Sequence, residues 1–311
     1  MRIFRQPSRF ILLTFLLIFA CSPNSWASEK SAGKNLYLEL DFDFTSGDYG
    51  SDTTTDSTVY TLLLGAYLGD RWDVQISAPY IYQNNSYVTT SGSIHYGSRM
   101  AGSPQVSPLA NGDGVGGTGG DGTGGMGGTG GDGTSGMDPT TTTTTTDVRE
   151  SQSGLGDMTL TLGYILHFEG RASPQVRAYA EGQLPTGDED KGLGTGGYGV
   201  EGGLELFKWT GPFSLLGKGA YTWQEDRSDL GLKNYWSYEV GLGYALTDRL
   251  RPGLSLWGAT EPAEGIGNLL EGKVQLHYRT GETSAIGAYV MKGLATASPD
   301  SGVGVFIFWN F

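Results

Sequence analysis

The stretch Gly304-Val305-Phe306-Ile307-Phe308-Trp309-Asn310-Phe311 decides the fold. In an extended chain, its alternate residues Val305, Ile307, Trp309 and Phe311 share one apolar face. A closed barrel needs a last strand that pairs with the first and faces lipid, whereas a soluble sandwich has no general reason to end mid-strand on an aromatic residue. The stretch therefore predicts a transmembrane β-barrel with Phe311 as an assembly signal. The last strand of a soluble sandwich is the alternative.

The amino end predicts export. Three arginines precede an apolar run over 10–20, and Ser25-Trp26-Ala27 follows with small residues at the positions before a cut. This is the pattern of a secretory signal, so we expect residues 1–27 to be a signal peptide cleaved after Ala27. Lipidation of Cys21 is the alternative. Either interpretation sends the chain across the inner membrane.

The exported part is acidic. Three of the 20 basic residues lie in the expected signal, which leaves 17 against 33 acidic residues and a formal charge of −16. Phosphate binding requires a basic surface, so nucleic acid is not expected as a partner. The only cysteine also lies in the signal, so no internal disulfide is expected. Beyond the signal, no apolar run reaches the roughly 18 residues of a membrane helix. A membrane would be crossed with strands.

Strand-length segments with a two-residue period recur along the chain. One opening case is 36–44, where five apolar residues alternate with Tyr37, Glu39, Asp41 and Asp43. The pattern predicts twelve strands, near 35–44, 58–68, 71–82, 155–168, 174–185, 198–208, 212–224, 235–246, 249–259, 269–278, 284–294 and 302–311.

Short connections alternate with long polar ones between these segments. An even strand number with short periplasmic turns and long external loops is typical of bacterial outer-membrane barrels. The chain from 28 to 311 is therefore predicted to be one all-β, antiparallel up-and-down barrel in the outer membrane, with both termini periplasmic. Outer-membrane lipid and the barrel insertion machinery are its expected partners. Pro79 and Pro252 fall within predicted strands, and we expect them at bulges or strand ends.

The longest external connection, 83–153, differs in composition from the rest. Its glycine-rich segment 116–126 is repeated over 127–137 with one change, and seven threonines follow. Such a segment has little apolar surface to offset the entropy of ordering, so a largely disordered loop is predicted. Calcium β-helix repeats have a nine-residue period with an inward apolar residue, and this eleven-residue repeat does not match them.

Charged and polar residues occupy the faces expected to point into the lumen. These candidates for a solute path are Glu39, Asp41, Asp43, Asp73, Arg177, Glu181, Glu201, Glu205, Lys218, Glu239, Arg251, Glu271, Lys273, His277 and Lys292. They would either form a salt-bridge lattice that braces a plugged lumen or line a pathway. A barrel of about 8 strands is filled by its interior side chains, and one of 16–18 strands encloses a wide aqueous channel. A barrel of twelve strands lies between these two cases. A narrow or partly obstructed pore is the preferred interpretation.

Catalysis and metal binding have weak support. A nucleophile–base mechanism needs a Ser or Thr beside a histidine that a third group orients. Of the three histidines, His95 lies in the long loop, His167 near the periplasmic rim and His277 on a lumen face without a Ser or Thr nearby in its strand. They are too scattered for a metal site. We expect no enzyme activity, no metal and no cofactor.

Two glycine-rich motifs carry a family resemblance. Gly154-Leu155-Gly156-Asp157 opens a strand, and Leu184-Pro185-Thr186-Gly187-Asp188 is followed by Gly192-Leu193-Gly194-Thr195-Gly196. Together they resemble the outer-membrane channels grouped as the meta-pathway phenol-degradation family, mainly over 154–311. The resemblance implies transport of aromatic or other hydrophobic compounds. Without any solute, the same residues suit tight turns in which Asp157 or Asp188 accepts hydrogen bonds from loop amides.

Two departures from that family stand out. About eight residues separate Ala27 from the first strand, which is too few for the plug that gates the related fatty-acid channels. The 83–153 insertion is not a feature associated with the family. Two functions are therefore carried forward. The first is a channel for passive uptake of small hydrophobic or aromatic solutes. The alternative is a structural or adhesive surface barrel that presents the Gly/Thr-rich loop.

Overall fold

The computed structural model describes residues 35–50, 53–85, 88–91, 94–97, 151–227 and 230–311. Within them the chain is almost entirely extended, and the one helix is the 3-10 turn η2 (Glu189–Lys191). The strands are β1 (Leu36–Gly47), β2 (Thr55–Leu68), β3 (Trp72–Gln83), β4 (Val88–Ser91), β5 (Ile94–Gly97), β6 (Gln152–Leu155), β7 (Met158–His167), β8 (Gln175–Leu184), β9 (Gly199–Thr210), β10 (Phe213–Gln224), β11 (Tyr235–Tyr244), β12 (Leu250–Ala259), β13 (Leu269–Arg279), β14 (Ser284–Gly293) and β15 (Ser301–Asn310).

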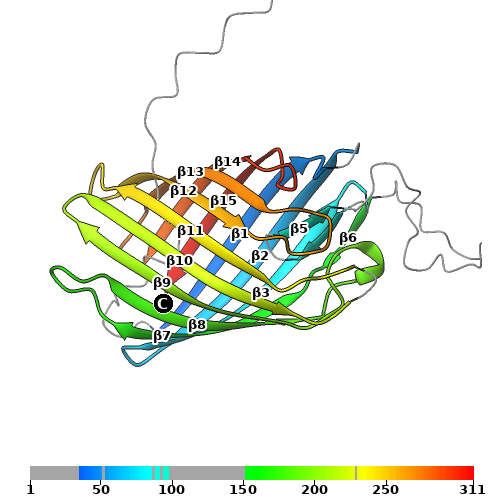
Figure 1. Cartoon of the computed structure of the whole chain (residues 1–311). Helices are drawn as coiled ribbons and strands as arrows, with labels where there is room; N and C mark the ends of the chain where they lie inside the picture. Colours follow the sequence, from blue (N-terminus) through cyan, green and yellow to red (C-terminus); the bar gives the residue numbers. More distant parts are fainter. Residues whose placement is uncertain (1–34, 51–52, 86–87, 92–93, 98–150, 228–229) are drawn as a thin grey trace, which may run out of the picture.

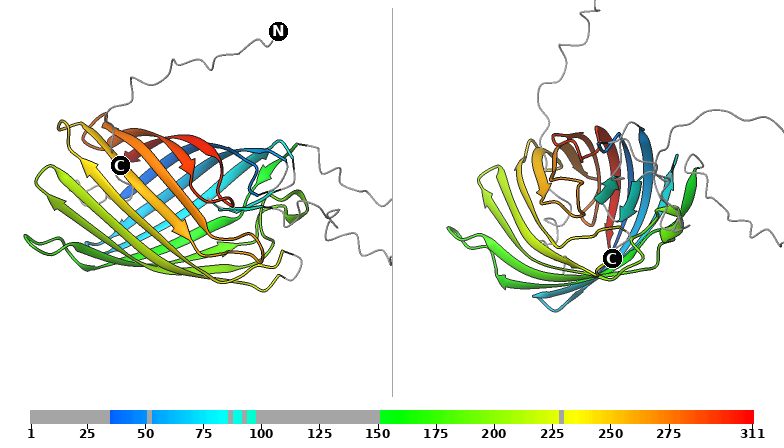
Figure 2. Two further views of the ribbon diagram at one scale, coloured as in Figure 1. Left: turned by 45° about the horizontal axis from the view of Figure 1, so that its top comes forward. Right: turned by 45° about the vertical axis from the view of Figure 1, so that its right-hand side comes forward.

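These strands form a closed antiparallel barrel (Figures 1 and 2). In the wall, β1, β2 and β3 pair in sequence order, β3 pairs with both β6 and β7, β7 to β15 again pair in sequence order, and β1 pairs with β15 to close the wall; β4 and β5 form a separate two-stranded sheet. Leu36 and Phe311 exchange two backbone hydrogen bonds of 3.1 and 2.8 Å at this seam. β6 and β7 both pair with β3, one after the other, and so act as a single wall strand. The barrel therefore has twelve wall strands, and the predicted fold is confirmed.

The predicted strand ends lie within three residues of the observed ones. The main difference is the break between β6 and β7, at Gly156 and Asp157, where one strand was expected. This break lies beside Pro79, whose carbonyl accepts a hydrogen bond of 2.9 Å from the Gly156 N–H. Proline has no N–H to donate, so Pro79 cannot complete a regular ladder with its neighbour. The interruption between β6 and β7 lies opposite it.

The outer surface carries the apolar band of a membrane protein. Val305, Ile307, Trp309 and Phe311 alternate with inward residues, and Trp309 and Phe311 are 40% and 56% exposed. The predicted lipid faces of β7, β11 and β13 point outward in the same way. Aromatic pairs lie near the strand ends, such as Trp72 with Tyr164. This closed wall with an apolar outer band places the chain in the outer membrane.

No helix among the described residues is long and apolar enough to cross a membrane.

The region 83–153 contains structure that its composition did not predict. β4 and β5 form a two-stranded hairpin within it, so His95 lies in a strand rather than in an irregular loop. The hairpin and η2 lie at the same end of the barrel, opposite the closing pair of termini (Figure 1). The glycine repeat over 116–137, the threonine run and the expected signal peptide lie outside the described residues. Their disorder and cleavage stay predictions.

The predicted assembly role of Phe311 leads to a first test. We expect Phe311→Asp to lower the amount of barrel inserted into the outer membrane several-fold while leaving permeability per inserted molecule unchanged. A charge near the interface costs only about 0–1 kcal/mol in the folded barrel, so the effect should arise during insertion. The measurement is the heat-shifted electrophoretic band in membrane fractions, with Phe311→Tyr as control. Normal insertion of Phe311→Asp would contradict the role.

Candidate functional site

The lumen is the candidate site, and its inner wall carries most of the candidate charges. Alternation with the exposed outer residues places these groups inside the barrel. The inward-facing candidates are Glu39, Asp41 and Asp43 on β1, Asp73 on β3, Arg177 and Glu181 on β8, Glu201 and Glu205 on β9, Lys218 on β10, Glu239 on β11, Arg251 on β12, and Glu271, Lys273 and His277 on β13.

The prediction for Lys292 is wrong. On β14 the inward residues include Tyr289 and Met291, so Lys292 points outward with a side chain that is 65% exposed. Its ammonium lies 3.8 Å from Asp300, which is similarly exposed. The position is one residue from the external end of β14, where the wall leaves the hydrocarbon and a charge on the outer face costs little.

An ion-paired group joins β3, β8 and β9 in the periplasmic half of the lumen. Arg177 donates two hydrogen bonds to Asp73, of 2.9 and 2.5 Å, and one of 2.8 Å to Glu205. The three side chains are only 12–14% exposed. A planar guanidinium suits this bidentate geometry, and here it bridges two carboxylates and reduces their mutual repulsion.

A second polar group lies beside it on β8, β9 and β10. Glu201 accepts hydrogen bonds from the hydroxyls of Tyr179 (2.5 Å) and Thr222 (2.8 Å), and the Lys218 ammonium lies 3.6 Å from it. Lys218 also stands 4.7 Å above the Tyr179 ring. Both groups match the salt-bridge lattice that is one of the two interpretations of the lumen charges.

The lattice does not fill the lumen. A cavity of about 430 Å³ lies within the barrel and is lined by nine of the wall strands together with Pro299. Its walls include Glu39, Asp41, Asp43, Glu181, Glu239, Glu271 and Lys273. A volume of this size is in the range of small-molecule sites, which run from about 300 to 1,000 Å³. The inner charges therefore include both a bracing lattice and a cavity wall.

The pairing of inward aromatic rings with glycines on the neighbouring strand is the feature that the sequence did not reveal. Phe306 and Tyr289 line the cavity, and each faces a glycine directly across the sheet, Gly287 and Gly304 respectively. A Cβ atom on either glycine would lie well inside van der Waals contact of the ring. Glycine thus lets each ring lie against the wall beside the cavity.

The same arrangement recurs nearer the periplasm. Tyr37 on β1 lies over Gly65 of β2, and its ring centroid is 5.0 Å from that of Tyr67 and 5.8 Å from that of Phe308. Rings from β14, β15, β1 and β2 therefore follow one another along one side of the lumen. The sequence gives only a weak indication of this row of rings, because the segment from Val305 to Trp309 is apolar on both faces.

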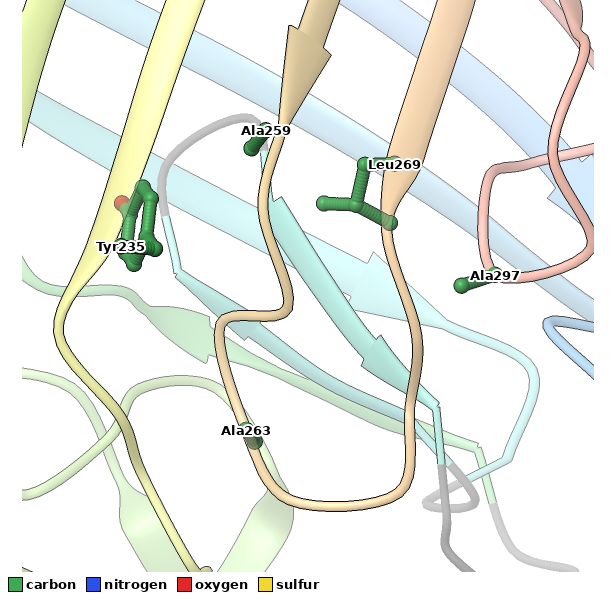
Figure 3. Packing of buried hydrophobic residues seen from close by; sticks show 5 residues of the cluster. All are labelled: Tyr235, Ala259, Ala263, Leu269 and Ala297. Carbon is green, nitrogen blue, oxygen red and sulfur yellow. The ribbon is translucent and has the colours of Figure 1, made fainter.

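The external loops that follow β10, β12 and β14 pack together at the ends of β11, β12 and β13. Tyr235, Ala259, Ala263, Leu269 and Ala297 form a buried apolar cluster there (Figure 3). The Gln224 amide ties two of the loops by donating to the carbonyls of Lys233 (2.7 Å) and Pro262 (3.0 Å).

In the turn after β1, burial raises the pKa of the Tyr49 phenol.

The glycine-rich motifs meet at one buried carboxylate. Asp157, 1% exposed, accepts hydrogen bonds from the backbone N–H groups of Gly187 (3.0 Å) and Thr195 (2.8 Å) and from the Gln183 amide (2.9 Å). Thr195 adds its hydroxyl at 3.2 Å. The loop over 185–198 is thereby held so that Leu193 packs on inward-facing Val59 and Ile81 inside the external mouth. For Asp157, the turn-stabilising interpretation agrees with the structure.

The histidines occupy three separate places. His277 is fully buried, with its ring 4.9 Å from that of Phe306 and its Nε2 3.4 Å from the Gln275 amide oxygen. His167 lies in the periplasmic turn region, where its Nε2 is 2.8 Å from the Ser173 hydroxyl, a contact that sequence reasoning missed. Among the described residues no three His, Cys, Asp or Glu side chains are placed to hold a metal ion.

Comparisons with known proteins agree with this architecture. A model of one family, described as "Putative MetA-pathway of phenol degradation", matches residues 85–311. The COG4313 outer membrane channel from Pseudomonas putida F1 superposes with a TM-score of 0.61 at 15% identity, covering 94% of this chain and 100% of that one. The NanC porin superposes less well, with a TM-score of 0.48 at 8% identity over 88% and 98% of the two chains. No curated protein matches the sequence.

Proposed function

This chain belongs to the family whose model it matches, and from that membership and the geometry of its lumen we propose that it is a channel for the passive uptake of small aromatic or hydrophobic solutes. The resemblance that its glycine-rich motifs suggested is confirmed. The fold is that of an outer-membrane channel. Passive uptake and the nature of the solute are proposed from the family and the lumen.

The observation that carries the proposal is the row of rings along the lumen wall. Tyr289 and Phe306 line the cavity, and Tyr37 and Phe308 continue the row toward the periplasmic end. Aromatic rings contact one another favourably in tilted or offset arrangements, worth about 0.5–1.5 kcal/mol beyond the burial of area. A ring-shaped solute could exchange one such contact for the next without leaving an apolar surface.

The polar groups of the lumen support the same proposal, since carboxylates from several strands lie beside the rings and the Arg177–Asp73–Glu205 group lies on β3, β8 and β9. The carboxylates and the Arg177 group keep their part of the lumen hydrated, so a solute that also carries a hydroxyl group finds hydrogen-bond partners there. A cavity with an apolar side and a few polar groups is the usual form of a small-molecule site. The adhesive alternative depends on the glycine repeat, which lies outside the described residues, and no observation on the described ones favours it.

The packing of Phe306 on Gly287 provides the test. We expect Gly287→Ala to push the ring into the bore and to reduce solute permeation several-fold, because a Cβ has no room between ring and wall. The measurement is uptake of benzyl alcohol by vesicles with a lipopolysaccharide outer leaflet, normalised to inserted protein. The variant Gly287→Ala/Phe306→Ala removes the displaced ring and should restore permeation.

Gly202 supplies the matched control. It faces outward on β9, and a Cβ there meets nothing within 4 Å, so Gly202→Ala should permeate as the original protein does. Well-inserted original protein that shows no uptake above empty vesicles would overturn the proposed function. Unchanged uptake by Gly287→Ala would show that solutes do not pass along this side of the lumen.

A further inference from the structure

The charges around the lumen cavity are unevenly distributed. Among the described residues that line it, six carry carboxylates and only Lys273 carries a cation. The carboxylates come from four different strands: Glu39, Asp41 and Asp43 from β1, Glu181 from β8, Glu239 from β11, and Glu271 from β13. The excess of negative charge therefore surrounds the cavity rather than forming one local cluster.

The other inward cations are placed elsewhere. Arg177 is bound to Asp73 and Glu205, and Lys218 lies 3.6 Å from Glu201. The Arg251 guanidinium stands 4.7 Å above the Trp209 ring near the periplasmic end. None of these three cations lines the cavity. Their direct contacts are with lattice groups, so the carboxylates that line the cavity outnumber the one cation in its wall.

Neutral hydrogen bonds do not remove this excess. Glu181 accepts a bond of 2.7 Å from the Thr161 hydroxyl, and Asp43 accepts one from the Tyr289 hydroxyl. Hydroxyl donors orient a carboxylate without neutralising its charge. Lys273 itself lies 5.2 Å above the Tyr289 ring, so the single cation is shared between the carboxylates and an aromatic face.

The rest of the cavity wall combines uncharged polar side chains with apolar ones. Val59, Leu63, Tyr289, Met291 and Phe306 contribute to it alongside the carboxylates. A solute with an aromatic body and a cationic group matches both kinds of wall, since ring faces also attract cations. A carboxylate of the same size meets the same apolar surface but is repelled by the acidic one.

We propose that the cavity selects solutes by charge: it admits neutral aromatic molecules, favours aromatic ammonium ions and rejects aromatic carboxylates. This inference rests on the proposed uptake function and adds the charge class of the solute. Clefts lined by charge of one sign enrich counter-ions by roughly 10- to 1,000-fold, and co-ions are depleted correspondingly.

Three solutes of matched size test the proposal in the vesicle assay at neutral pH. These are benzyl alcohol, benzylammonium and benzoate. We expect benzylammonium to permeate at least about 10-fold faster than benzoate, at the lower end of the enrichment found in charged clefts. The double variant Glu181→Gln/Glu239→Gln preserves shape and replaces two half-buried carboxylates that line the cavity, so this ratio should fall to about a third of its original value or less.

A charge outside the lumen serves as control. Glu282 lies exposed in the periplasmic turn between β13 and β14, so Glu282→Gln should leave the ratio unchanged. If the double variant does not insert, the original protein still gives an answer through its zero-current potential in a potassium chloride gradient, which should have the sign of cation preference. An anion-preferring sign would overturn the proposal.

The outcomes separate the two proposals. If no solute permeates, the uptake function fails. If benzyl alcohol permeates but benzylammonium and benzoate do so equally, uptake stands and charge selection is overturned. Charge selection also fails if the ratio persists in the double variant, because the selecting charges would then lie elsewhere.

Discussion

Arg177→Met is expected to destabilise the barrel by about 3–5 kcal/mol, because removing one partner of a buried ion pair leaves the remaining charges uncompensated. Arg177 forms ion pairs with both Asp73 and Glu205, and all three side chains are 12–14% exposed. The measurement is urea unfolding of the refolded protein in lipid vesicles. Methionine keeps much of the volume of arginine, so packing changes little.

Two further variants separate charge from geometry. Arg177→Lys retains the charge but cannot form the bidentate contact with Asp73, so it should fall between the original protein and Arg177→Met. The triple variant Arg177→Met/Asp73→Asn/Glu205→Gln removes all three charges and should recover most of the lost stability. If Arg177→Met unfolds like the original protein, the group does not brace the lumen.

Asp157→Ala is expected to release the loop over 185–198. The change leaves the backbone N–H groups of Gly187 and Thr195 without their acceptor, and each such loss costs about 1–3 kcal/mol when the group stays buried. Leu193 would then lose its fixed position against Val59 and Ile81. The measurement is the rate at which a protease cleaves this loop in intact proteoliposomes, which should rise at least about 10-fold for a loss of roughly 1.4 kcal/mol or more.

Asp188 is the matched control within the same motif. Its side chain is 40% exposed and forms an i,i+3 ion pair with Lys191 at 2.6 Å. Exposed ion pairs of this kind contribute little to stability. Asp188→Ala should leave the cleavage rate nearly unchanged. If Asp157→Ala keeps the loop protected but abolishes permeation, Asp157 serves the solute rather than the loop.

Which residues face the lumen and which face lipid could be predicted, because a charged side chain on the lipid face is energetically costly. Along β1, Glu39, Asp41 and Asp43 must share the inner face, since a charge facing hydrocarbon costs several kcal/mol. That penalty disappears where the strands leave the membrane. Lys292 lies at such an end, and its inward placement was wrong for that reason.

The rings of the lumen could not be predicted in the same way. Alternation distinguishes two faces only when they differ in polarity, and β15 is apolar on both between Val305 and Trp309. The pairing of Phe306 with Gly287 depends on register between strands. A single sequence specifies a glycine and a ring, but the sheet determines that they are neighbours.

Asp157 shows a similar division. Its motif indicated an acceptor for loop amides, and that role agrees with the structure. Its second partner, Thr195, is 38 residues away and reaches it only because the loop folds back into the mouth. The β4–β5 hairpin was also missed, since short strands inside a polar insertion have no pattern long enough to distinguish them from a loop.

By itself, the sequence determined the barrel, its strand number and the side of the wall on which most charges lie. These properties follow from a two-residue period and from the cost of placing charge in lipid, and both are local. Only the tertiary structure decided which charges are ion-paired and which surround the cavity. Arg177 meets Asp73 and Glu205, whereas Glu39 and Glu271 face the cavity, because closure of the barrel brings together strands that are distant in the chain.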